Sequence, residues 1–139
     1  MIVIAAIDNK GGMMFNYRRL SEDSAVNKRI LELTKNSSLW MNSYSGRLFE
    51  NMAGSEHIRV DDEFIDRTVP GEYCFIEGTP VAQHAPEIGR IILFKWNRDY
   101  PQDVSFDIDV NAPEWKLVKT EDFAGSSHER ITMEEYVQI

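Results

Sequence analysis

The pattern of apolar and polar residues predicts that strands and helices alternate in the first half of the chain. Residues 2–7 form a continuous apolar run with β-branched side chains, followed by a glycine-rich loop. Such a run is typical of a strand covered on both faces. Residues 21–35 carry apolar side chains three and four residues apart behind several possible N-caps, which predicts a helix with one buried face. A short apolar segment at 39–41 predicts the next strand, and residues 44–52 predict a second helix.

The second half of the chain is richer in predicted strands. The clearest is the apolar run at residues 90–96, which ends in a polar loop. Weaker strand patterns occur at residues 72–76, 104–108, 115–119 and 131–139. Because helices separate only the early strands, the order predicts one mixed sheet, parallel at first and antiparallel at its end, with helices on its faces.

Composition and charge limit the classes of function. The chain has 139 residues, 42% of them hydrophobic, which predicts a single globular domain over residues 1–139. The formal charge of −8 argues against binding nucleic acid through its phosphates. No apolar run is long enough to span a membrane. The only cysteine, Cys74, excludes an intramolecular disulfide, and we therefore expect a cytoplasmic protein.

Several kinds of chemistry have no signature in the sequence. The three histidines and one cysteine have no metal-ligand spacing, so no metal site is expected, and each histidine is interpreted as a surface or loop residue. Residues 125–128 place two serines next to His128, but such neighbours do not by themselves form a catalytic triad, and the segment is interpreted as a turn. Four basic residues flank the first helix; they either bind an anion or face solvent.

The order and spacing of several segments along the chain are informative. These segments are Ile4-Ala5-Ala6 before Gly12-Met13, the helix start Leu20 to Asp23, the strand and turn Leu39 to Ser45, the strand Tyr73 to Gly78, and the late strand Arg90 to Trp96. In order and spacing they resemble the dihydrofolate reductase family. The resemblance implies a dihydrofolate-reductase-like three-layer α/β fold with a central mixed sheet flanked by helices. It touches most of the chain, with the exception of residues 50–71.

The resemblance also implies roles for single residues. Asp23 matches the acid on the first helix that binds the pterin ring and governs proton delivery, and a partly apolar pocket would raise its pKa. The alternative is that Asp23 only caps the helix. Ser45 matches a hydroxyl that meets cofactor and substrate, with capping of the second helix as its alternative role.

The remaining matches concern a ligand pocket and a cofactor site. The residues that would line the pocket are Ile4, Ala5, Ala6, Phe49 and Ile76, which are otherwise ordinary core residues. The residues that match the cofactor-binding segments are Gly12, Met13 and Gly78, which implies NADPH as a possible cofactor and no metal.

Departures from the family pattern leave two functions open. Glu77 replaces the first glycine of a pair beside the cofactor, and its charge should repel a diphosphate; Ser43 replaces an arginine that contacts a cofactor phosphate. The first function is an NAD(P)H-dependent reductase of a pterin-like or other flat heterocycle, with Asp23 handling the proton. The alternative is a non-catalytic small-ligand-binding or protein-interaction domain that kept the fold and lost the cofactor site.

Overall fold

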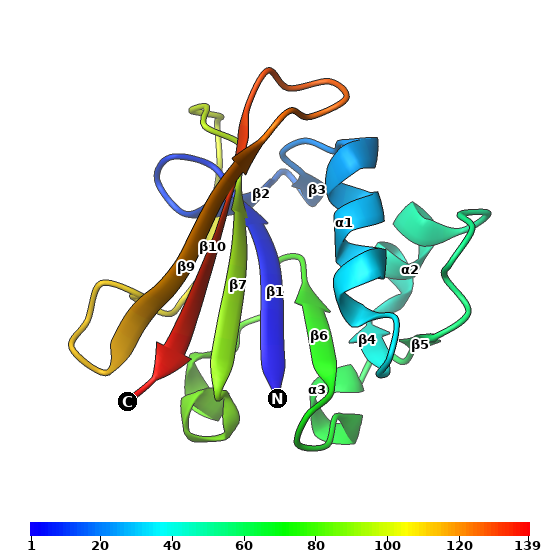
Figure 1. Cartoon of the computed structure of the whole chain (residues 1–139), viewed down its shortest axis with the longest axis vertical. Coiled ribbons are helices and arrows are strands. Elements are labelled where there is room, and N and C mark those ends of the chain that lie inside the picture. Colours follow the sequence, from blue (N-terminus) through cyan, green and yellow to red (C-terminus); the bar gives the residue numbers. More distant parts are fainter.

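A seven-stranded mixed sheet forms the centre of the computed structural model, which describes residues 1–139 (Figure 1). Its order is β5-β4-β6-β1-β7-β10-β9. The strands are β1 (Ile2–Ile7), β4 (Leu39–Met41), β5 (Ile58–Val60), β6 (Tyr73–Ile76), β7 (Arg90–Lys95), β9 (Trp115–Phe123) and β10 (Ile131–Gln138). The first five in the order pair in parallel, and β10 pairs antiparallel with both β7 and β9. The predicted mixed sheet is therefore confirmed.

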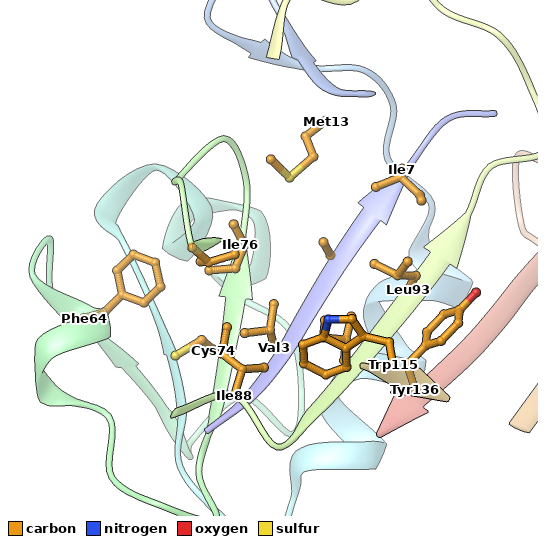
Figure 2. Packing of buried hydrophobic residues seen from close by; sticks show 13 residues of the cluster. Val3, Ile7, Met13, Phe64, Cys74, Ile76, Ile88, Leu93, Trp115 and Tyr136 are labelled. Atoms are coloured by element: carbon orange, nitrogen blue, oxygen red, sulfur yellow. The ribbon is translucent and has the colours of Figure 1, made fainter. Parts of the chain in front are cut away.

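Two apolar cores lie on opposite faces of this sheet. One core gathers Ile4 of β1 with Val26 and Ile30 of helix α1 (Ser24–Thr34) and Phe49 of helix α2 (Ser43–Phe49). The other core contains the alternate residues of β1, such as Val3, together with residues of β6 and β7. Trp115 of β9 and Tyr136 of β10 complete it (Figure 2). Since successive side chains of a strand point to opposite faces, β1 has to be apolar throughout, as its sequence predicts.

A small second sheet lies near the carboxyl end of β1 (Figure 1). It has the order β3-β2-β8, with β2 (Gly12–Phe15), β3 (Arg18–Arg19) and β8 (Val104–Ser105). The hairpin between β2 and β3 turns at Asn16 and Tyr17, which both have positive φ angles. The remaining elements are the short helix α3 (Phe64–Arg67) and the 3-10 helix η1 (Ala82–Glu87).

Both long helices begin at capping side chains that the sequence left ambiguous. Asp23 is the N-cap of α1 and accepts a hydrogen bond from Ala25 N, so the helix begins later than residue 21. Asn42 caps α2 by accepting from Ser45 N, which corrects the alternative that Ser45 itself is the cap.

Cys74 is fully buried in β6, and its burial raises the pKa of its thiol to about 11. A thiol that is both protonated and inaccessible reacts slowly, because the thiolate is the nucleophile. We expect a chromogenic disulfide reagent to label the native protein at pH 8 at least about 100-fold more slowly than the protein unfolded in guanidinium. Equal rates would show that β6 opens readily.

Candidate functional site

A cleft opens where the carboxyl ends of β1, β6 and β4 meet, the usual place for a site in an open parallel sheet. Its outer part is a groove of about 620 Å³, whose lining is Met14, Tyr17, Asn42, Tyr44, Glu77, Gly78, Thr79, Asp103 and Val104. Its inner part is a cavity of only about 10 Å³, whose lining is Ala6, Met13, Arg19, Leu20, Ser21, Ile76, Glu77 and Trp96. Glu77 is the one residue that lines both spaces.

An ion pair closes the cleft at this point. Both carboxylate oxygens of Glu77 accept from Arg19, at 2.7 Å from Nε and 3.0 Å from Nη2. Ser45 Oγ donates to Glu77 Oε1 at 2.8 Å, and the guanidinium of Arg19 stacks over the ring of Tyr44. Burial disfavours the charge on Arg19, but Glu77 outweighs it and raises the pKa of the guanidinium above its ordinary value. We call these four residues the gate.

A second cluster ties the start of α1 to the loop between β9 and β10. Asp23 Oδ1 accepts from Ala25 N and from the backbone and hydroxyl of Ser126. Oδ2 accepts from the backbone and hydroxyl of Ser127 and from His128 Nδ1 at 2.9 Å. The Asp23 side chain is fully buried.

These contacts decide the ionisation of Asp23. Burial alone would raise its pKa, but the donors from Ser126, His128 and Ser127 outweigh burial and hold the pKa far below its ordinary value. The expected raised pKa is therefore wrong, because a loop about 100 residues further along the chain supplies donors to this carboxylate, and no local pattern indicates that contact. Both carboxylate oxygens of Asp23 accept hydrogen bonds, and Asp23 does not line the inner cavity.

His128 lies in the loop between β9 and β10, as expected of a surface or loop residue, but its side chain is buried. Its ring stacks on Trp96 with centroids 4.7 Å apart. Its Nε2 lies 3.0 Å from Ser21 Oγ and 3.3 Å from the hydroxyl of Tyr100. The histidine thus bridges Asp23 and Ser21, two residues that lie on the same segment before α1.

The structure separates the five residues expected to line a pocket. Ala6 and Ile76 line the inner cavity. Ile4, Ala5 and Phe49 are at most 1% exposed and belong to the two cores, which matches the alternative interpretation that they are ordinary core residues. Ser45 is also buried, with its hydroxyl directed at Glu77 rather than into open space.

Of the three residues matched to cofactor-binding segments, only Gly78 borders the groove. Gly12 is buried: its amide donates to Asp8, and a Cβ there would collide with Gln102. Met13 is 4% exposed and is part of a core. Gly78 has a φ of +86°, and the sulfur of Met14 already fills the space where a Cβ would lie.

The residues at the groove do not fit the diphosphate of NADPH. Glu77 and Asp103 are the only charged side chains in its lining, and both are acids. Two of the first three amides of α2 are also occupied, because Asp62 accepts from Ser43 N and Asn42 accepts from Ser45 N. A diphosphate would meet no cation in this lining.

Two other features are plain in the structure. No three His, Cys, Asp or Glu side chains lie close enough together to hold a metal ion. None of the helices combines the length and the apolar character needed to cross a membrane.

The fold and the cleft define a three-layer α/β protein with its candidate site at the ends of parallel strands. Among solved structures, the chain is similar to dihydrofolate reductase from Enterococcus faecalis complexed with NADP(H) and RAB-propyl. The TM-score is 0.69 at 16% sequence identity, over 99% of this chain and 95% of the other. The chain therefore has a dihydrofolate-reductase-like fold. No family model and no curated protein matches its sequence.

Sequence reasoning missed the partners that shape this site. Arg19 was one of four basic residues expected to bind an anion or face solvent, and its partner Glu77 lies 58 residues away. His128 lies in a polar loop, where nothing in the local pattern indicates burial. The one usable signal was charge: Glu77 follows directly on the apolar strand β6 and therefore needs a cation nearby.

Proposed function

We propose that this chain is a ligand-binding protein of dihydrofolate-reductase-like fold that does not carry out hydride transfer from NADPH. The observation that carries the proposal is the gate: its partly buried, bidentate Arg19–Glu77 pair borders an inner cavity of only about 10 Å³. A cavity of this size holds about one water molecule, so a pterin ring has no room there while the gate is closed.

The outer groove supports binding of a flat, uncharged or cationic aromatic molecule. Tyr17 and Tyr44 offer aromatic surface, and Met14 offers a soft apolar contact. Asn42 and Thr79 can form hydrogen bonds, and Asp103 favours a positive charge. A volume of about 620 Å³ lies in the range of small-molecule sites.

A reductase remains the second candidate, and one observation favours it. Gly78 lines the groove at the end of β6 and has a positive φ, a backbone conformation that glycine adopts without strain. The similar enzyme from E. faecalis was solved with NADP(H). For hydride transfer in this chain, the gate would have to open and Asp23 would have to leave its donors.

The groove is tested by a thermal-shift panel of aminopyrimidines, pterin and aromatic amines, with Thr79→Trp as the variant that fills the groove. We expect at least one compound to raise the Tm of the native protein and not that of Thr79→Trp. Thr120→Trp, on the exposed edge strand β9, is the matched control and should keep the response. Equal shifts in Thr79→Trp and the native protein would contradict binding in the groove.

A further inference from the structure

A nucleophile, a base and an orienting acid meet beside the inner cavity, and nothing in the ligand-binding function uses them. Ser21 Oγ lies 3.0 Å from His128 Nε2, and His128 Nδ1 lies 2.9 Å from Asp23 Oδ2. These are hydrogen-bond distances, and the two ring nitrogens face the partners they need in a serine–histidine–acid relay. The relay joins residues from two segments more than 100 positions apart, which explains why local sequence patterns did not predict it.

The surroundings of the relay fix the histidine tautomer. The carboxylate of Asp23 is held ionised by backbone and hydroxyl donors, so it accepts and His128 Nδ1 carries the hydrogen. Nε2 then presents its lone pair to the hydroxyls of Ser21 and Tyr100. Stacking on Trp96 holds the ring in this orientation. The imidazole is thus positioned to take the proton of Ser21.

We propose that Ser21, His128 and Asp23 form a nucleophilic serine site that takes an acyl group from small activated esters. Ser21 lines the inner cavity together with Arg19, whose Nε and Nη2 both donate to Glu77. The cavity holds only about 10 Å³, so an ester reaches Ser21 when the Arg19 side chain moves away from Glu77 toward the outer groove. The proposal is independent of which ligand the outer groove binds.

The chemical step is an ordinary acyl transfer to water. Ser21 Oγ bonds to the carbonyl carbon while its proton passes to His128 Nε2, and the carbonyl oxygen takes up the negative charge of the tetrahedral intermediate. The carbon–oxygen bond to the leaving alcohol then breaks, and the alcohol takes the proton from His128. Water, deprotonated by the same nitrogen, releases the acid and restores Ser21, so the sum is ester plus water giving acid plus alcohol.

The test treats the native protein with p-nitrophenyl acetate and locates acetyl groups by peptide mass spectrometry. We expect acetylation of Ser21, with release of nitrophenol about 100-fold faster than from Ser21→Ala or His128→Gln. Ser21→Ala removes a single hydroxyl and should stay folded, so it remains informative even if His128→Gln does not fold. Ser105→Ala, at an exposed serine of β8, is the matched control and should react like the native protein.

The pH profile separates a nucleophilic site from a merely structural contact. Acetylation of Ser21 should fall at low pH, because only a neutral imidazole can accept the proton of Ser21, and this dependence should vanish in His128→Gln. Acetyl groups spread over lysines, with Ser21 labelled no more than Ser105, would overturn the proposal. The cluster would then serve only to fasten the β9–β10 loop to α1.

Discussion

Asp23→Asn is expected to lower the free energy of unfolding by about 3 kcal/mol, a fall in Tm on the order of 10 °C. The amide group would replace one acceptor oxygen by a donor. It would face the donors of Ser127 and His128 or, in the other orientation, those of Ala25 and Ser126. The cap on α1 would be kept only if the remaining oxygen stayed opposite Ala25 N. Thermal and urea unfolding measure the effect.

The same carboxylate makes stability depend on pH in a definite direction. Its pKa in the folded protein lies below the value of about 3.9 for an unfolded aspartate. Its contribution is therefore fully present above that value and is lost as pH falls toward the folded pKa. Between pH 6 and pH 3, the native protein should lose more stability than Asp23→Asn does. Parallel losses would contradict the structural role that the contacts of Asp23 define.

Ser24→Ala is the matched control for this prediction. Ser24 lies next to Asp23, but its amide and hydroxyl contact only the exposed hydroxyl of Ser126. We expect a loss below about 1 kcal/mol and no change in the pH dependence. A loss as large as that of Asp23→Asn would mean that the loop contacts as a whole, rather than the buried carboxylate, stabilise this end of α1.

Arg19→Met is expected to lower the free energy of unfolding by about 2–3 kcal/mol, since it leaves Glu77 nearly buried with Ser45 as its remaining partner. The double variant Arg19→Met/Glu77→Met should regain most of the loss, because an apolar pair of similar size needs no compensating charge. Urea unfolding of the two single variants and the double variant gives the coupling free energy between the residues.

Arg29→Met is the matched control for the gate. Arg29 also forms an ion pair, with Glu121 at 2.8 Å, and also stacks on an aromatic ring, that of Phe123. This pair is more exposed, and its loss should cost less than about 1 kcal/mol. Equal losses in Arg19→Met and Arg29→Met would show that burial of the gate has no energetic consequence.

The strands of the sheet were predictable where burial on both faces leaves no polar position. β1 and β7 are apolar along nearly their whole length, so their limits followed from composition alone. By contrast, β3 has two residues and β5 has three, mostly exposed, and no period can be detected in so short a segment. The start of α1 was uncertain because Ser21, Asp23 and Ser24 are all good N-caps.

The site was harder to predict than the fold, because its contacts join residues far apart in the chain. The sequence identified Asp23 and Glu77 as informative acids but not their partners, and the ionisation of an acid depends on its partners. Figure 1 shows why: the β9–β10 loop and the β2–β3 hairpin lie at the same end of the sheet as the start of α1.

Titration of the native protein and Glu77→Gly with NADPH, followed by tryptophan fluorescence and thermal shift, tests whether the gate and the acidic groove exclude the cofactor. The gate and the acidic groove predict no saturable binding to the native protein up to about 1 mM, which corresponds to a binding free energy weaker than about 4 kcal/mol. Glu77→Gly, which removes the charge and frees Arg19, should bind more tightly. Saturable micromolar binding of NADPH to the native protein would contradict the loss of the cofactor site and favour the reductase function.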